Sequence, residues 1–271
     1  MKTVRVFAPA SIANLGCGFD IMGLALDEVG DVLEMTGNRA QVDVVIKRKI
    51  YPGSGIGSSS ASSAAAAFGM NELFGCPLSE EDVVVCAMEG ENLASGGYHA
   101  DNAAPAVMGG IVLIRGYEPL DLIKLPVPGD FYCAVIHPKL VVSTKEARSI
   151  LPKKVDMHAA IAQWGNVGGL VAGLYSGNIG LVGRSMRDSI AEPYRKSFIP
   201  GFDELREKVL QSGSLAMNIA GSGPSVFALA NRYEKAQRAG AIMEKHFSDL
   251  DIPYECYVVK VSNRGARLTA Y

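Results

Sequence analysis

A glycine- and serine-rich stretch at residues 51–67, with the sequence YPGSGIGSSSASSAAAA, has the residue types needed to bind an anion. Its glycines alternate with other residues, and glycine tolerates positive φ angles and lets a ligand approach the backbone closely. Serines and four consecutive alanines follow, and these residues favour a helix start and a helix body. The N-terminus of a helix offers free N–H groups and a partial positive charge. We therefore predict a phosphate-binding loop that leads into a helix.

The stretch at residues 51–67 lacks the signatures of two common nucleotide-binding loops. No Gly-Lys-Ser/Thr follows the glycines, so it is not a Walker loop, and the G-x-G-x-x-G spacing of a dinucleotide fold is absent. A flexible Gly/Ser linker is the remaining alternative, although a linker does not require an alanine run. The residues expected to contact phosphate are Pro52, Gly53, Ser54, Gly55, Ile56, Gly57, Ser58, Ser59, Ser60, Ala61 and Ser62.

Two polar residues, Asn14 and Asp20, lie in an otherwise apolar, glycine-containing turn after a predicted strand at Val4–Ala8. We expect Pro9 to end that strand, because proline lacks a backbone N–H. Asn14 and Asp20 either cap the turn or hold a small polar substrate.

A helix is predicted over Ser79–Ser95, because Ser79 and Asp82 have the spacing of a capping box. Helical spacing places Glu91 on the same face as an apolar stripe that includes Val84 and Met88, with Ser95 next on that face. A buried carboxylate requires a partner or a metal ion. The alternative is a carboxylate at a frayed helix end.

The segment 96–102, GGYHADN, is predicted to be a tight loop that brings three polar side chains together: His99, Asp101 and Asn102. A single histidine is more often structural than catalytic, and the three residues are close enough in sequence to form one site. Further along the chain, Arg148 and Arg195 are either surface residues or a pair that binds a carboxylate, since guanidinium groups bind carboxylates in a bidentate manner.

Composition narrows the class of protein. The 271 residues have a formal net charge of −2 and 48% hydrophobic residues, which suits a globular core and argues against a nucleic-acid or membrane-surface protein. Five scattered cysteines form no C-x-x-C pair, so neither a disulfide framework nor a zinc site is indicated. No apolar run is long enough to span a membrane, and no signal-peptide core is present, so we expect a cytoplasmic protein.

Three segments resemble, in order, the three motifs of the galactokinase, homoserine kinase, mevalonate kinase and phosphomevalonate kinase superfamily. The sequence PASIANLGCGFD at residues 9–20 is similar to the first motif, that of homoserine kinases in particular. The glycine loop resembles the second motif, and GSGPS at residues 221–225 resembles the third, although that segment alone could be a plain turn. The resemblance implies an α+β fold with a ribosomal-protein-S5-like, ATP-binding domain, placed at residues 1–140, and a ferredoxin-like domain at residues 141–271.

The resemblance also implies an activity, the ATP-dependent phosphorylation of the side-chain hydroxyl of L-homoserine, with Mg²⁺ as cofactor. Glu91 lies in a segment similar to the one whose glutamate binds Mg²⁺, so Ser58 and Glu91 are the expected metal ligands. The expected catalytic residues are Asn14, Ser58, Glu91 and Asn102. The expected substrate-binding residues are Asn14, Asp20, His99, Asn102, Thr144, Arg148, Arg195 and Gly221.

Alternatives to this interpretation stay open at the level of sequence. Asn102 occupies the position where relatives of the mevalonate type have an aspartate base, so no protein base is expected, with Asp101 as the alternative. Family members have a longer segment before the glycine loop, with residues that contact adenine. Here Ile50 runs almost directly into Pro52, so that segment is missing or the nucleotide pocket is truncated.

Three other functions are compatible with the sequence. The protein could be another kinase of the superfamily, of the mevalonate or diphosphocytidyl-methylerythritol type, a non-catalytic ligand-binding member, or a nucleotide-binding partner module. We expect a homodimer without nucleic-acid or membrane partners.

Overall fold

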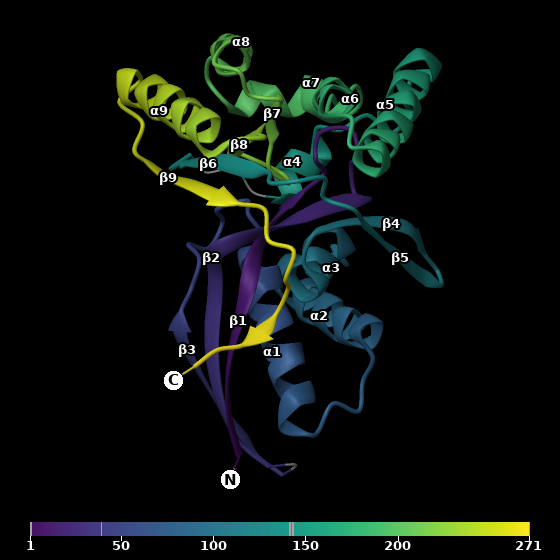
Figure 1. Cartoon of the computed structure of the whole chain (residues 1–271), viewed down its shortest axis with the longest axis vertical. Coiled ribbons are helices and arrows are strands. Elements are labelled where there is room, and N and C mark those ends of the chain that lie inside the picture. Colours follow the sequence, from purple (N-terminus) through teal and green to yellow (C-terminus); the bar gives the residue numbers. More distant parts are fainter. Residues whose placement is uncertain (1, 39, 141, 143, 271) are drawn as a thin grey trace. The chain divides into compact units, whose positions relative to one another are not determined.

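The computed structural model describes residues 2–38, 40–140, 142 and 144–270 (Figure 1). The chain divides into two units. The first contains the residues up to Ala13, Asp20–Lys124 and the residues from Ser262 onward, and the second contains Asn14–Phe19 and Leu125–Val261. This division differs from the single cut expected after residue 140, because the chain crosses between the units more than once.

The first unit is built on a six-stranded sheet with the order β10-β1-β2-β4-β5, in which β3 also pairs with β2. Its strands are β1 (Lys2–Ala13), β2 (Met22–Gly37), β3 (Val42–Arg48), β4 (Ile111–Tyr117), β5 (Leu120–Leu125) and β10 (Arg267–Leu268). The short strand β10 pairs with β1, with Val6 opposite Leu268. This pairing returns the C-terminal residues to the first unit.

The strand predicted at Val4–Ala8 is present, but Pro9 does not end it. Strand β1 continues to Ala13, and its register with β2 shifts between Pro9 and Ser11. A bulge of this kind accommodates a residue that lacks an N–H donor. The prediction that Pro9 ends the strand was wrong, because the proline lies at a bulge within the strand.

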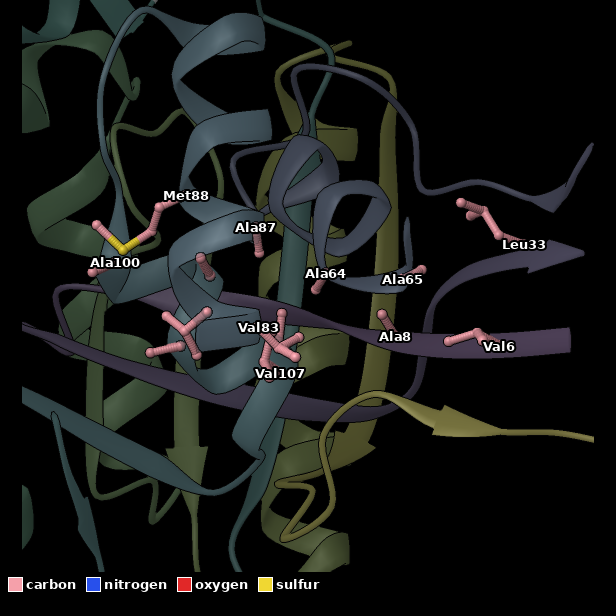
Figure 2. Close-up of a cluster of buried hydrophobic side chains, with 14 of the residues drawn as sticks. Val6, Ala8, Leu33, Ala64, Ala65, Val83, Ala87, Met88, Ala100 and Val107 are labelled. Atoms are coloured by element: carbon pink, nitrogen blue, oxygen red, sulfur yellow. The ribbon is translucent and has the colours of Figure 1, made fainter. Parts of the chain in front are cut away.

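Three helices cover one face of this sheet: α1 (Ser58–Leu73), α2 (Glu80–Ser95) and α3 (Ala100–Met108). Figure 2 shows Ala64 and Ala65 of α1, Val83 and Ala87 of α2 and Val107 of α3 among the buried side chains that join helices to strands. The alanine run predicted to form a small-residue helix therefore lets α1 pack closely against β1 and β2. This core fixes the start of α1, where the glycine loop ends.

The capping box predicted at the start of α2 is confirmed. The Ser79 side chain accepts a hydrogen bond from the Asp82 N–H, and the Asp82 side chain accepts one from the Ser79 N–H. Its apolar stripe is buried, and Glu91 is buried with it. The extension of that face to Ser95 was wrong, since Ser95 is exposed in the last turn of the helix.

The second unit contains a four-stranded antiparallel sheet with the order β7-β8-β6-β9, formed by β6 (Tyr132–Pro138), β7 (Ala216–Ile219), β8 (Val226–Ala230) and β9 (Tyr254–Lys260). Helices α8 (Phe202–Gln211) and α9 (Tyr233–Asp249) pack on it through a shared core that includes Phe202, Met243 and Phe247. The order of strands and helices is that of a ferredoxin-like fold, as expected.

The remaining helices of this unit connect β6 to α8. They are α4 (Thr144–Ser149), α5 (Met157–Ser176), α6 (Ile179–Ser185) and α7 (Glu192–Arg195), followed by a 3₁₀ turn at Lys196–Phe198. Asp156 caps α5 by accepting hydrogen bonds from the N–H groups of His158 and Ala159. Among the described residues, no helix combines the length and the hydropathy that crossing a membrane demands.

Candidate functional site

The glycine loop in the first unit has the backbone conformation that its sequence predicts. Gly53, Gly55 and Gly57 have φ angles of 79°, 71° and 68°, which lie in the left-handed region. Helix α1 begins at Ser58, as predicted, but its N-cap is Gly57 and not a serine, and no side chain caps it. No acidic residue lies in its first turn. The start of α1 therefore presents backbone N–H groups, and its own first turn supplies no carboxylate that would compete with a bound anion.

Gly57 is held tightly between two other parts of the first unit. A Cβ atom at this position would lie 2.2 Å from Ser11 Oγ and 3.0 Å from Asn102 Oδ1. The Ser11 hydroxyl also donates a hydrogen bond of 2.9 Å to Asn102 Oδ1. The end of the loop, strand β1 and helix α3 thus meet at one point, and Asn102 lies beside the loop.

Asn102 and Asp101 lie in a helix and not in the predicted loop. Helix α3 begins at Ala100, with His99 at its N-cap position, so Asp101 and Asn102 occupy its first turn. The loop predicted over residues 96–102 was therefore wrong for residues 100–102. The alanine-rich sequence from Ala103 favours a helix, and that helix begins three residues earlier than expected. Asp101 is 3% exposed, whereas His99 is half-buried.

The two predicted metal ligands, Glu91 and Ser58, have different hydrogen-bond partners. The Ser60 hydroxyl donates a hydrogen bond of 2.7 Å to Glu91 Oε2, and Glu91 is only 4% exposed. The Ser58 hydroxyl donates a hydrogen bond of 3.1 Å to the Ile50 carbonyl. The structure therefore pairs Glu91 with Ser60 and not with Ser58.

These oxygen atoms are chemically suited to a hard cation such as Mg²⁺, which prefers carboxylate and other oxygen ligands and retains water. The described residues contain no group of three or more histidine, cysteine, aspartate or glutamate side chains that could hold a metal ion. The metal roles of Ser58 and Glu91 stay a prediction.

Asp31 of strand β2 is a residue that sequence analysis missed. Its buried carboxylate accepts hydrogen bonds from the Ile50 N–H, at 2.7 Å, and from the Ser62 hydroxyl. Burial raises the pKa of Asp31 above its ordinary value, against the opposing effect of the hydrogen bond from Ser62. Asp31 thus ties the residue before the glycine loop to helix α1 after it. The sequence gives little signal for it, because the same strand also contains Asp27, Glu28 and Glu34.

Asp20 also belongs to the first unit. It has a φ angle of 59°, which is uncommon for a residue with a side chain, and its backbone carbonyl accepts a hydrogen bond of 2.8 Å from the Tyr117 hydroxyl. The turn conformation expected around Asp20 is therefore present. Its role in binding a substrate stays a prediction.

In the second unit, three predicted substrate-binding residues meet at one carbonyl group. The Asn14 side chain donates a hydrogen bond of 2.9 Å to the Gly221 carbonyl, and Arg195 Nη1 donates one of 3.0 Å to the same oxygen. Arg195 Nε donates another, of 3.1 Å, to the Ala147 carbonyl in α4. Residues 207 positions apart in sequence are therefore brought together. Their roles in binding a substrate stay a prediction.

The two predicted arginines lie near the same aromatic ring. The guanidinium carbon of Arg195 is 5.0 Å from the ring centroid of Phe19, and that of Arg148 is 5.9 Å from it. Arg195 is 5% exposed, whereas Arg148 is exposed. Thr144 begins α4, but its side chain lies outside the described part of the structure.

A small cavity of about 10 Å³ lies beside Arg195, and we call it the Arg195 pocket. It is lined by Asn14, Gly16, Asp188, Glu192, Arg195, Asn218, Ile219 and Gly221. Sequence analysis did not predict Asp188, Glu192 or Asn218, because only the fold brings them beside Asn14 and Gly221.

The acidic groups of this pocket are held firmly. The Asp188 carboxylate accepts hydrogen bonds from the N–H groups of Ile190, Ala191 and Glu192 at 2.7–3.0 Å. Glu192 is 7% exposed and pairs with Arg206. Burial raises the pKa of Glu192 even though Arg206 acts in the opposite direction. The pocket therefore combines two acidic side chains with the guanidinium group of Arg195.

Comparisons with known proteins show the family of the chain. Residues 23–110 match the family described as GHMP kinases N terminal domain, and residues 170–249 match GHMP kinases C terminal. The homoserine kinase of Chlorobium phaeovibrioides is 41% identical, and the alignment covers 99% of this chain and 100% of that protein. The homoserine kinase of Pyrococcus abyssi is 34% identical over 97% of this chain and 98% of its own.

Solved structures show the same similarity. The crystal structure of homoserine kinase from Cytophaga hutchinsonii superposes with a TM-score of 0.93 at 41% identity, covering 99% of this chain and 98% of that chain. Mevalonate kinase from L. major, at 16% identity and a TM-score of 0.73, shares the fold. The alignment with the Chlorobium phaeovibrioides protein has 319 positions, 48 more than the 271 residues here, so that relative contains segments without a counterpart in this chain. The chain belongs to the homoserine kinase family of the GHMP kinases.

Proposed function

We propose that this protein transfers the γ-phosphoryl group of ATP to the side-chain hydroxyl of L-homoserine, giving O-phospho-L-homoserine for threonine synthesis. The main support is that Asn14 and Arg195 both donate hydrogen bonds to the Gly221 carbonyl. In addition, the relatives that match the full length of the chain are homoserine kinases. An arginine held in place by two backbone carbonyls suits recognition of the carboxylate of an amino acid.

The glycine loop is proposed to bind the phosphates of ATP. The left-handed glycines and the uncapped start of α1 support this role, because they expose N–H groups to an anion. Asp31 supports it indirectly by joining Ile50 and Ser62 on either side of the loop. The full set of proposed phosphate contacts is residues 52–62.

In the reaction, the homoserine hydroxyl forms a bond with the γ-phosphorus while the bond from that phosphorus to the bridging oxygen of ADP breaks. The hydroxyl proton leaves to solvent or to a phosphate oxygen. A neutral amide cannot take this proton, and Asn102 Oδ1 already accepts a hydrogen bond from Ser11. Phosphoryl transfer depends mostly on positioning and charge stabilisation, so the mechanism needs no dedicated protein base.

Ser58 and Glu91 are proposed to hold Mg²⁺, with Ser60 holding the Glu91 carboxylate in place. When bound, this ion would offset the charge on phosphate oxygens.

The amino-acid substrate is proposed to have its own set of contacts. Asp20 is proposed to bind the ammonium group, and Arg148 and Arg195 are proposed to bind the carboxylate. The remaining proposed substrate contacts are Asn14, His99, Asn102, Thr144 and Gly221. Asp101 is the alternative base.

A coupled ADP-release assay with homoserine, mevalonate and galactose tests the proposal. We expect ADP release that depends on homoserine. Turnover of mevalonate without turnover of homoserine would assign the protein to another branch of the superfamily, and ATP binding without substrate-dependent ADP release would indicate a non-catalytic member. A homodimer in the cytoplasm, without nucleic-acid or membrane partners, completes the proposal, and light scattering after gel filtration measures the assembly.

A further inference from the structure

Helix α5 (Met157–Ser176) of the second unit is largely apolar on two opposite sides. One side packs beside α6 (Figure 1), and its buried residues are Gln163, Leu170, Gly173 and Leu174. The other side leaves large apolar side chains 55–64% exposed, and these are Met157, Ile161, Trp164 and Tyr175. A helix that is apolar all round is normally buried. The exposed side of α5 therefore indicates a partner outside the unit.

The exposed residues of α5 follow the spacing of one side of a helix. We call this surface the α5 face, and its residues are Met157, Ile161, Trp164, Gly165, Gly168, Ala172 and Tyr175. The 20 residues of α5 include no Asp, Glu, Lys or Arg, so a partner can cover the face without removing a charge from water. Helices that lie on a membrane surface have many Lys or Arg on their polar side, which α5 lacks. These features favour a protein partner with an apolar surface.

Two glycines of the α5 face have no explanation in the packing of the chain itself. A Cβ atom at Gly165 or Gly168 would meet nothing within 4 Å in the described part of the chain. In contrast, a Cβ atom at Gly169 would lie 2.5 Å from Ser185 Oγ in α6. Glycine within a helix is less favourable than alanine. The contact with α6 explains Gly169, and the close approach of a helix from outside the chain would explain the other two.

The order of large and small residues makes the α5 face complementary to itself. When two copies of α5 pack antiparallel about a two-fold axis at Gly168, positions equally far from Gly168 face each other. Trp164 then faces Ala172 of the second copy, and Ile161 faces Tyr175 of the second copy. The two glycines meet at the axis, where the helices are closest. A second copy of the chain therefore supplies the apolar, closely packing surface that the α5 face requires.

The area of the α5 face is sufficient for a weak dimer. Aromatic side chains bury about 150–250 Å² each, so the exposed parts of Trp164 and Tyr175 supply roughly 200–300 Å². Met157, Ile161 and the adjoining Val155 add roughly 100–200 Å². Two copies then approach the roughly 1,000 Å² of the smallest specific interfaces, so we expect a Kd of roughly 1–100 µM.

We propose that the α5 face binds the α5 face of a second copy of this chain, with the two helices antiparallel. This contact is the interface of the homodimer. The inference rests on the homodimer of the proposed function and not on the proposed reaction, because the α5 face contains none of the proposed catalytic or substrate-binding residues.

Trp164 gives a direct test, because it is the single tryptophan of the chain. Its fluorescence is recorded together with sedimentation velocity over a range of concentrations that brackets the expected Kd. The emission should move to shorter wavelengths as the mass doubles, with the same midpoint in both measurements. A monomer at every concentration, with unchanged emission, would overturn the inference, whether another part of the chain or a different protein covers the face.

Gly168→Ala separates packing between copies from folding of the helix. Alanine favours the helix, so the dilute variant should have an equal or higher Tm. The two added Cβ atoms would meet at the axis, so the Kd of the dimer should rise by at least roughly 10-fold. Gly180→Ala in α6 is the matched control, because its Cβ atom would lie 3.6 Å or more from its neighbours. The control should leave the Kd unchanged, and an unchanged Kd for Gly168→Ala would overturn the inference.

A pair of introduced charges tests the antiparallel orientation. Ile161→Glu and Tyr175→Lys each bury an unpaired charge in the interface, so each should raise the Kd by at least roughly 10-fold. The double variant should recover part of this loss, because the new carboxylate faces the new ammonium group of the second copy. The two positions are about 21 Å apart along one helix, so they do not pair within one copy. Absence of any recovery would contradict the antiparallel contact. Leu210→Glu on α8 is the control for a charge at another exposed apolar position.

Two kinds of failure can be told apart. If the wild-type protein dimerises and the α5 variants dimerise equally well, the interface lies elsewhere and this inference alone is wrong. If the wild-type protein is a monomer, the proposed homodimer and this inference both fail. The ADP-release assay with homoserine tests the proposed reaction separately from either result.

Discussion

The hydroxyl of Ser60 donates a hydrogen bond of 2.7 Å to the buried carboxylate of Glu91, and this bond joins the first turn of α1 to α2. The two residues are 31 positions apart in sequence, and Ser60 is fully buried. The carboxylate proposed to bind the metal ion is therefore oriented by the helix whose start is proposed to bind phosphate. This relationship makes the role of Glu91 testable without disturbing the fold.

Glu91→Gln is expected to keep the hydrogen bond from Ser60 while removing the negative charge. Because the charge would bind Mg²⁺, kcat for ATP turnover should fall by at least roughly 10- to 100-fold, with a higher Mg²⁺ concentration needed for half-maximal activity. The measurement is ADP release across a Mg²⁺ titration, with Tm as the control for folding. Unchanged turnover and Mg²⁺ dependence would refute the metal assignment.

Gly57→Ala is expected to destabilise the protein more than Gly53→Ala. Both glycines have left-handed φ angles, so each substitution has a backbone cost of about 1–2 kcal/mol. A Cβ atom at position 57 would also overlap Ser11 Oγ, whereas at position 53 it would meet nothing within 4 Å. Steric overlap of this kind adds about 1–3 kcal/mol. The difference between the two variants, measured by denaturant unfolding, isolates the packing of Gly57, and equal losses would show that this packing has no energetic effect.

Arg195→Lys is expected to raise the KM for homoserine by roughly 10- to 100-fold, because lysine lacks the fork of donors that binds a carboxylate. The substitution also removes at least one of the hydrogen bonds to Ala147 and Gly221, so a lower Tm is expected. Steady-state kinetics with each substrate varied in turn give the measurement, and the exposed Arg238→Lys in α9 is the surface control. A change confined to the KM for ATP would place Arg195 outside the amino-acid site.

His137 is expected to make stability depend on pH. It is buried in β6, its Nδ1 atom shares a hydrogen bond of 3.0 Å with the Ser225 hydroxyl, and burial lowers its pKa below the ordinary value of 6.5. The unfolded state therefore binds a proton more readily than the folded state. This contribution to stability is complete above about pH 6.5 and is lost as the pH falls from there through the folded-state pKa.

The measurement is the free energy of unfolding from pH 5 to pH 8 for the wild type and for His137→Gln, which keeps a polar partner for Ser225. One proton gives a slope of up to about 1.4 kcal/mol per pH unit. The variant should lose this part of the slope below pH 6.5. Parallel curves for the two proteins would show that His137 titrates alike in both states.

Local sequence signals predicted the parts of the fold that depend on neighbouring residues. The capping box of Ser79 and Asp82 and the burial of Glu91 follow from helical spacing alone, and both are confirmed. The start of α1 at Ser58 follows from the change from glycine to serine and alanine. In contrast, the bulge that carries β1 past Pro9 depends on its pairing with β2, which no local pattern shows.

The candidate functional residues divide in the same way. Asn14, Arg195 and Gly221 could be predicted from motifs, and the structure brings them together. Asp31 and Asn218 could not, because the first acts through residues on both sides of the glycine loop and the second matters only because a cavity forms beside it. A polar residue in a buried strand is a weak signal until its partners are known.

The central claim is that the protein joins the γ-phosphoryl group of ATP to the hydroxyl oxygen of homoserine. ³¹P NMR of a reaction with ATP, Mg²⁺ and homoserine measures this directly, since a phosphate ester of the side chain couples to the adjacent methylene protons. We expect that ester and ADP to form in equal amounts. ADP accompanied only by inorganic phosphate, or no ADP at all, would contradict the account.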